Sequence, residues 1–217
     1  MEFREVVRRR RMVRNYDPDR EVSRTQVDAL LDLAVRAPSA GFSQGWQFVV
    51  LDEAGARSTF WSLTTDPDEP ADRWLHGMQS SPVLILCLSD KNAYLDRYAD
   101  PDKGWTDRDE ARWPVPYWDV DTGMAALLIL LGAVDDGLSA CFFGVPPTAH
   151  DAVRSAFGLE ADLRFVGVIS LGYGAPDVRS PSLKRGRRTV QAVTRYNPRP
   201  DDHPTSDPTS DPTPGER

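Results

Sequence analysis

Apolar positions recur at helical spacing between Ser23 and Ala37, and this segment gives the strongest local prediction in the chain. Ser23 and Gln26 form a capping-box pair at its start. Pro38 ends the predicted helix, because the residue before a proline is displaced from the α region. The apolar face, at i, i+3, i+4, i+7 and i+8, comprises Val27, Leu30, Leu31, Ala34 and Val35.

Shorter apolar runs predict buried strands, and longer ones predict further helices. Thr122–Asp136 is apolar almost all round, which predicts a central helix buried on several sides, with Gly137 as its C-terminal cap. A short helix opens at Phe3 and runs into an arginine cluster, and another begins at Pro147 and ends at Gly158. The predicted strands are Phe48–Leu51, Val83–Leu88, Ala140–Val145 and Phe165–Leu171. Without a regular βαβ rhythm, this order predicts an α+β fold with a mixed central sheet wrapped by helices.

Tyr94–Trp118 lacks periodicity and is rich in Asp, Pro, Tyr and Trp. A long loop inside a compact domain is usually functional or mobile. Its aromatic residues could form a lid over a flat substrate, or they could pack down on the core as part of a surface excursion. The aromatics in question are Trp105, Trp113, Tyr117 and Trp118.

The C-terminal segment differs in kind from the rest of the chain. Pro-Thr-Ser-Asp occurs twice, at 204–207 and 208–211, and large apolar side chains are absent from 198 onward. Such a segment buries too little surface to offset its ordering entropy. We therefore predict a single domain over 1–197 and a disordered tail over 198–217.

Charge and composition exclude several classes of function. The net charge of −7 and the pI near 5.0 argue against general binding to nucleic acid or to an anionic membrane. The basic residues concentrate at Arg8–Arg14 and Lys184–Arg188, which favours a small anionic ligand. Three scattered histidines indicate no metal site. Two cysteines in apolar runs, no secretory signal and no apolar run long enough to span a membrane favour a soluble cytoplasmic protein.

Candidate chemistry gathers at the first arginine cluster and at the turn Ala37–Phe48. Arginine forks bind phosphate through paired charge-assisted hydrogen bonds. If the cluster is helical, Arg10 and Arg14 share a face; a run of arginines is, however, more often a solvated surface. The small residues of the turn allow backbone amides to approach a ligand closely. No G-x-G-x-x-G, P-loop or nucleophile elbow is present, which indicates that a bound cofactor carries the chemistry of any enzyme here.

These two segments resemble motifs of the nitroreductase family of FMN enzymes. Arg10-Arg11-Met12-Val13-Arg14-Asn15-Tyr16 resembles Arg-Arg-Ser-x-Arg-x-Phe, and Ala37–Phe48 is similar to Ala-Pro-Ser-Ala-Gly-Asn-x-Gln-Pro-Trp-x-Phe. Gly137–Cys141 and Lys184-Arg185 resemble later landmarks, so that the likeness spans Glu2 to Tyr196. The chain departs from the motifs where it has Met12 for serine, Phe42 for asparagine and Gly45 for proline.

The resemblance implies a homodimer with FMN at the subunit interface, where the long central helix would lie. It implies that Arg10, Arg11, the Met12 backbone and Arg14 hold the phosphate, ribityl chain and pyrimidine edge, with Arg14 stabilising the charge of reduced flavin. No protein nucleophile is expected. The other implied cofactor contacts are Pro38, Ser39, Gln44, Ala140, Cys141 and Arg185, and the expected substrate contacts are Phe42, Trp113 and Tyr117.

The implied activity is electron transfer from NADH or NADPH through FMN to a small, flat acceptor such as a nitroaromatic or a quinone. Four alternatives stay open at this point. They are a reductive dehalogenase of the same fold, a flavin-fragmenting enzyme of the same fold, a relative that uses a deazaflavin, and a flavin-binding protein without turnover.

Overall fold

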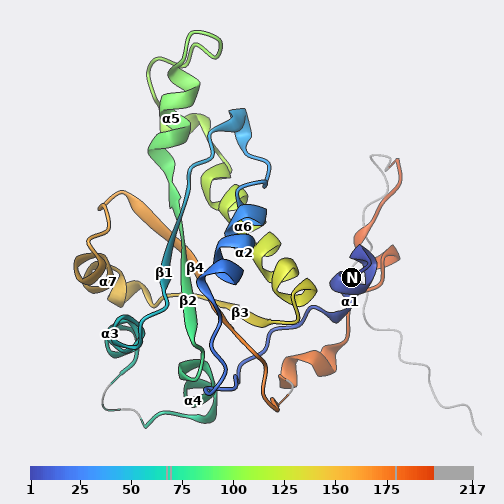
Figure 1. Cartoon of the computed structure of the whole chain (residues 1–217). Helices are drawn as coiled ribbons and strands as arrows, with labels where there is room; N and C mark the ends of the chain where they lie inside the picture. The colour runs from blue at the N-terminus through green and yellow to red at the C-terminus, as the bar shows by residue number, and fades with distance from the viewer. Residues whose placement is uncertain (67, 69, 179, 198–217) are drawn as a thin grey trace, which may run out of the picture. The chain divides into compact units, whose positions relative to one another are not determined.

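The computed structural model describes residues 1–66, 68, 70–178 and 180–197. These fall into two units, Met1–Asp177 and a second that begins at Val178. The first unit holds all the long helices and strands described below (Figure 1). The tail predicted to be disordered, 198–217, lies outside the described residues.

The centre of the first unit is a four-stranded sheet in the order β1-β2-β4-β3. Its strands are β1 (Trp46–Leu51), β2 (Val83–Asp90), β3 (Ser139–Phe143) and β4 (Leu163–Gly172). All three strand pairs are antiparallel, and a single parallel bridge joins Met12 to Ala140 at the outer edge of β3. The predicted α+β fold is confirmed. The sheet was expected to mix parallel and antiparallel strands, and in the described residues the parallel pairing is limited to that bridge.

Side chains of β2 alternate between two hydrophobic cores, as the period of a strand requires. Val83, Ile85 and Cys87 join one core with residues of α2 (Arg24–Ala34) and α6 (Tyr117–Asp135). Leu84, Leu86 and Leu88 join the other, with residues of α3 (Ala54–Thr64) and α7 (His150–Phe157). The sheet is therefore covered on both faces, which explains why β2 reads as one continuous apolar run (Figure 1).

The helix predicted from Ser23 is confirmed in its start, and Val27, Leu30 and Ala34 of its predicted face are buried, whereas Val35 is exposed. Ser23 caps α2, and the reciprocal capping box with Gln26 is present. Gly137 and Gly158 follow their helices with φ of +74° and +62°, the left-handed conformation expected of a C-terminal cap. The remaining helices of the first unit are α1 (Phe3–Arg9), α4 (Arg73–Gln79) and α5 (Lys91–Ala99).

Helix α6 runs through the middle of the first unit, as predicted, but starts at Tyr117 rather than at Thr122. By length and composition alone it could cross a membrane, but half of that stretch is buried inside the protein. It packs against α2 and against every strand of the sheet. These contacts are those of a core helix.

The prediction of one long loop over Tyr94–Trp118 is wrong at both ends. Tyr94 belongs to α5 and Trp118 to α6, because each ring packs into the interior, where both are fully buried. The irregular part between the helices is 100–116, with one short 3₁₀ turn at Glu110–Arg112. We call residues 91–116 the α5 excursion; it projects beyond the end of the sheet (Figure 1).

Candidate functional site

The arginine cluster leaves α1 at Arg9 and continues as extended chain along β3. The Val13 amide donates to the Ala140 carbonyl at 3.1 Å. The Phe142 amide donates to the Met12 sulfur at 3.4 Å. Because the cluster is extended, the helical arrangement in which Arg10 and Arg14 would share a face is not formed; pairing with β3 decides its conformation. We call residues 10–14 the arginine segment.

Tyr16 anchors the arginine segment to the sheet. Its hydroxyl, fully buried, lies 2.7 Å from the Val13 carbonyl and 2.7 Å from the Ser170 hydroxyl on β4. Burial raises the pKa of this phenol, so that it stays protonated as a donor. The arginine segment also packs against α4, where Gly77 has no side chain to keep the Arg14 backbone away. A Cβ at Gly77 would lie 2.1 Å from the Arg14 carbonyl oxygen. The segment is therefore fixed from both sides.

Arg10 lies beside a hollow of about 100 Å³ at the edge of β3. Its Nη1 is buried and has no hydrogen-bond partner in the described residues. Within the same described ranges, no carboxylate forms an ion pair with Arg10, Arg11 or Arg14. A buried donor without a partner is costly, and an anion in the hollow would satisfy it. The hollow is lined by Arg9, Arg10, Arg11, Val13, Leu130, Val134, Leu138, Ser139 and Ala140.

Arg14 is held through its backbone. Its amide donates to Asp177 Oδ2 at 2.9 Å, and its Nη1 donates to the Met12 carbonyl at 3.4 Å. Asp177 was not predicted from the sequence, because the contact spans 163 residues. The side chain of Arg14 thus keeps most of its donors for a ligand.

The two predicted β3 contacts, Ala140 and Cys141, are both buried next to the arginine segment. Burial raises the pKa of the Cys141 thiol, which leaves it a neutral, weakly reactive group. Nucleophilic catalysis by this thiol is therefore not favoured.

The second predicted motif forms a tight turn between α2 and β1, which we call the 39–44 turn. Ser39 Oγ accepts from the Gln44 amide at 3.0 Å, and Ser43 Oγ donates to the Ala40 carbonyl at 2.7 Å. Pro38 and Gln44 are exposed. The Phe42 side chain is 74% exposed.

The 39–44 turn and the arginine segment lie at opposite ends of α6. The Ala40 amide donates to Asp121 near the start of the helix, whereas Arg10 shares its hollow with Leu130 and Val134 near the end. At 1.5 Å per residue, these contact points are separated by about 14 to 20 Å along the helix axis. A single chain therefore does not bring the two predicted motifs together.

The other predicted residues have separate surroundings. Trp113 packs in the α5 excursion with its ring centroid 4.6 Å from that of Tyr98 and 5.9 Å from that of Tyr94, and Tyr117 is half exposed beside it. Arg185 belongs to the second unit, at the end of a 3₁₀ turn, and its contact with a phosphate stays a prediction. No cluster of metal-ligating side chains is found among the described residues.

Two residues near the 39–44 turn were not predicted from the sequence. Asp121 is a buried carboxylate in the second turn of α6, and Arg97 on α5 bonds to the Gly41 carbonyl. An acidic residue directly before the apolar run of α6 was the available signal for Asp121. Arg97 had none, because nothing in the sequence links it to Gly41, which lies 56 residues away.

Comparisons with known proteins agree with these motifs. A candidate NADH dehydrogenase/NAD(P)H nitroreductase of Archaeoglobus fulgidus is 28% identical over 167 residues, covering 76% of this chain and 80% of the relative. A similarly named protein of Methanothermobacter thermautotrophicus is 26% identical over 183 residues, covering 81% of this chain and 78% of the relative.

Solved structures share the fold. A candidate nitroreductase from Bacillus subtilis superposes with a TM-score of 0.71 at 18% identity, covering 90% of this chain and 98% of its own. One from Desulfovibrio desulfuricans, solved in complex with FMN, gives 0.66 at 23% identity and covers 92% and 99%. The sequence model of the nitroreductase family matches residues 7–173, from the end of α1 to the end of the sheet. The chain therefore belongs to the nitroreductase family.

Proposed function

We propose that this protein is an FMN-dependent oxidoreductase that passes electrons from NADH or NADPH to a small, flat acceptor such as a nitroaromatic or a quinone. Family membership supports an oxidoreductase, and the names of the archaeal relatives support the nicotinamide donor. The FMN complex of the Desulfovibrio neighbour supports the cofactor. The observation that carries the proposal is the buried, unpartnered Nη1 of Arg10 beside its hollow.

The residues of the arginine segment fit FMN chemically. Arg10 and Arg11 would hold the phosphate, for which a guanidinium free of carboxylates is suited. Arg14 would face the pyrimidine edge, with its backbone held by Asp177. The apolar side chains of Leu130, Val134 and Leu138, which line the same hollow, would exclude water from the bound group.

When bound, FMN supplies the redox chemistry, accepting hydride from the nicotinamide and passing electrons to the acceptor. The protein's part is to bind and orient. Positive charge from Arg14, fixed in place by its neighbours, favours negative charge on the ring system it faces. Buried Cys141 offers no competing thiolate, since burial raises its pKa.

We further propose that two copies of the chain complete each site. The separation of about 14 to 20 Å between the motifs supports a site in which one copy contributes the arginine segment and its partner contributes the 39–44 turn. Exposed apolar side chains on α1, α2 and α6 support the same assembly. Apolar side chains that are exposed on neighbouring helices often mark a surface that binds another protein. They include Phe3, Val7, Leu33 and Leu127. A hollow among these helices, lined by Phe3, Val6, Leu33, Leu128 and Leu131, would receive the second copy.

The cofactor assignment is tested by FMN titration of Arg10→Met and Arg8→Ala. We expect Arg10→Met to weaken FMN binding by about tenfold or more, because a charge-assisted hydrogen bond is lost. Arg8, exposed on α1, is the matched control and should leave binding unchanged. Equal FMN affinity in both variants would contradict the assignment.

The shared site is tested by complementation. Ser39→Asp would place negative charge in the 39–44 turn, and Arg10→Met disables the arginine segment. In a heterodimer of these two variants, one site carries both changes and the other carries neither. Recovery of FMN binding in the heterodimer, absent from either variant homodimer, is expected. If the heterodimer binds no better than the homodimers, each site is built from a single chain.

A further inference from the structure

The 39–44 turn has a backbone that its own sequence disfavours. Gly41, Phe42 and Gln44 have φ of +61°, +58° and +51°. Glycine adopts this left-handed conformation freely, but phenylalanine and glutamine do not. Such a conformation persists only where the surrounding structure imposes it. The groups that hold this turn therefore decide where the Phe42 side chain points.

Asp121 holds the turn from one side. Its Oδ2 accepts from the Ala40 amide at 2.8 Å and from the Tyr94 hydroxyl at 2.8 Å. The Asp121 side chain is buried, so neither bond is exchanged for one to water. This carboxylate joins the turn to both α5 and α6.

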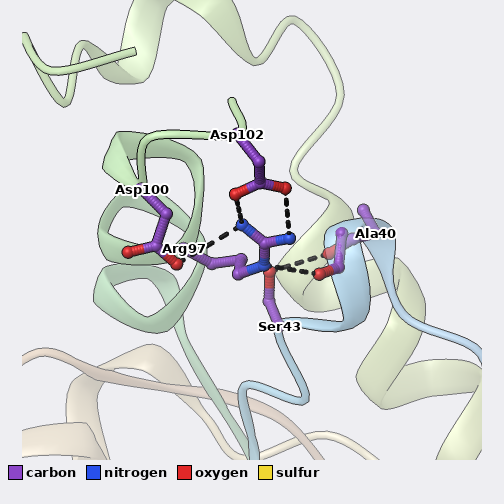
Figure 2. A network of polar contacts seen from close by, with 6 residues as sticks. Ala40, Ser43, Arg97, Asp100 and Asp102 are labelled. Atoms are coloured by element: carbon purple, nitrogen blue, oxygen red, sulfur yellow. Dashed lines mark hydrogen bonds and ion pairs between the residues drawn. The ribbon is translucent and has the colours of Figure 1, made fainter. Parts of the chain in front are cut away.

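Arg97 holds the turn from the other side. Its Nε donates to the Gly41 carbonyl at 2.9 Å. Its other two nitrogens form a fork on Asp102, at 2.7 and 2.8 Å, and Nη1 also lies 3.3 Å from Asp100 (Figure 2). The two carboxylates fix the plane of the guanidinium, and Nε is thereby directed at the turn. Tyr98 packs against Gly41 so closely that a Cβ there would lie 2.6 Å from its ring.

We propose that Arg97 and Asp121 are positioning residues that clamp the 39–44 turn between α5 and α6 and so set the place of Phe42 against the acceptor. The inference rests on the proposed function, in which the turn of one copy faces the flavin site of its partner. The Phe42 ring makes no ring contact in the described part of the chain, so its position follows the backbone. The α5 excursion then acts on acceptor choice through Asp100 and Asp102.

Arg97→Lys is the discriminating variant. Lysine keeps the positive charge beside Asp100 and Asp102 but lacks the fork, so it cannot pair with Asp102 and bond to Gly41 together. The matched control is Arg112→Lys. Arg112 forms a comparable fork on Asp107 in the same excursion, with bonds of 2.5 to 3.2 Å, and is not bonded to the turn. Asp102→Asn provides a second test that leaves Arg97 itself in place.

Two readouts are made on the FMN-loaded protein and on the three variants. Amide hydrogen exchange of a peptide that covers 39–45 reports the clamp, and kcat and KM for a nitroaromatic and a smaller quinone report acceptor choice. For Arg97→Lys we expect exchange in the peptide to rise about tenfold, with a change of similar size in the ratio of kcat/KM between the two acceptors. Asp102→Asn should shift both in the same direction, and Arg112→Lys should resemble the unaltered protein. FMN affinity should stay unchanged in Arg112→Lys and fall in Arg97→Lys and Asp102→Asn, because the loosened turn belongs to the proposed cofactor site.

Unchanged exchange at 39–45 in Arg97→Lys would overturn the clamp, whether or not the protein reduces either acceptor. If exchange at 39–45 rises but the ratio of kcat/KM between the two acceptors is unaltered, the proposal that the clamp sets acceptor choice through Phe42 is overturned. If the unaltered protein neither binds FMN nor oxidises NAD(P)H, the proposed function fails, and the exchange measurement still decides on the clamp. The two failures are thereby distinguished.

Discussion

Replacing Tyr16 by phenylalanine removes one hydroxyl from the interior without changing the shape of the ring. That hydroxyl joins two parts of the site: the arginine segment, through the Val13 carbonyl at 2.7 Å, and β4, through the Ser170 hydroxyl at 2.7 Å. Tyr16 is 1% exposed and Ser170 is fully buried, so that water cannot replace the lost partner. The change therefore tests how firmly the arginine segment is attached to the sheet.

The cost of the change follows from the bonds that are broken. Each of the two short hydrogen bonds contributes about 1 kcal/mol net, and the Val13 carbonyl is left without its hydroxyl partner. We expect Tyr16→Phe to lower the free energy of unfolding by about 2 to 3 kcal/mol. Ser170→Ala should cost less, because the Tyr16 hydroxyl can still donate to Val13. The double variant should show a coupling of about 1 kcal/mol between the two residues.

Equilibrium unfolding in urea measures these free energies. An unchanged m-value shows that each variant exposes the same surface area on unfolding as the unaltered protein. The FMN titration of Tyr16→Phe is made alongside, and weaker binding is expected because the arginine segment is loosened. A loss of stability under about 0.5 kcal/mol with no coupling to Ser170 would refute the reasoning, since surface changes commonly reach that size.

Three further changes give expectations of the same kind. Gly77→Ala should lower stability by about 1 to 3 kcal/mol and weaken FMN binding, measured by urea unfolding and titration, because the new methyl displaces the Arg14 backbone. Asp121→Leu should cost about 2 to 5 kcal/mol in thermal unfolding, since the Ala40 amide and the Tyr94 hydroxyl both lose their acceptor. Burial raises the pKa of the Cys87 thiol from 9.0 to about 12. The unfolded chain releases this proton first, so stability should fall as the pH rises from 9 toward 12, a slope that Cys87→Ala removes.

Features of the fold that depend on neighbouring residues were predictable from the sequence. The capping box of Ser23 and Gln26 starts α2, and the apolar run of β2 is buried on both faces. Features that depend on distant contacts were not. The extended arginine segment is decided by its pairing with Ala140, and the buried positions of Tyr94 and Trp118 by packing against the core.

The site divides in the same way. Residue types suited to an anion were visible in the arginine segment, and the small residues of the 39–44 turn were visible as a motif. The groups that hold them were not, because Asp121 lies 81 residues from Ala40 and Arg97 lies 56 residues from Gly41. The separation of the two motifs along α6 also required the structure, and it supports the site between two chains that the family resemblance implies.

Whether the protein is an FMN-dependent oxidoreductase is decided by its visible spectrum, recorded before and after anaerobic addition of NADPH and then NADH. We expect oxidised flavin bands that bleach with at least one of the two nucleotides and return when a nitroaromatic or a quinone is added. A protein that is colourless and does not bind added FMN, or a bound flavin that neither nucleotide bleaches, would contradict the proposed function.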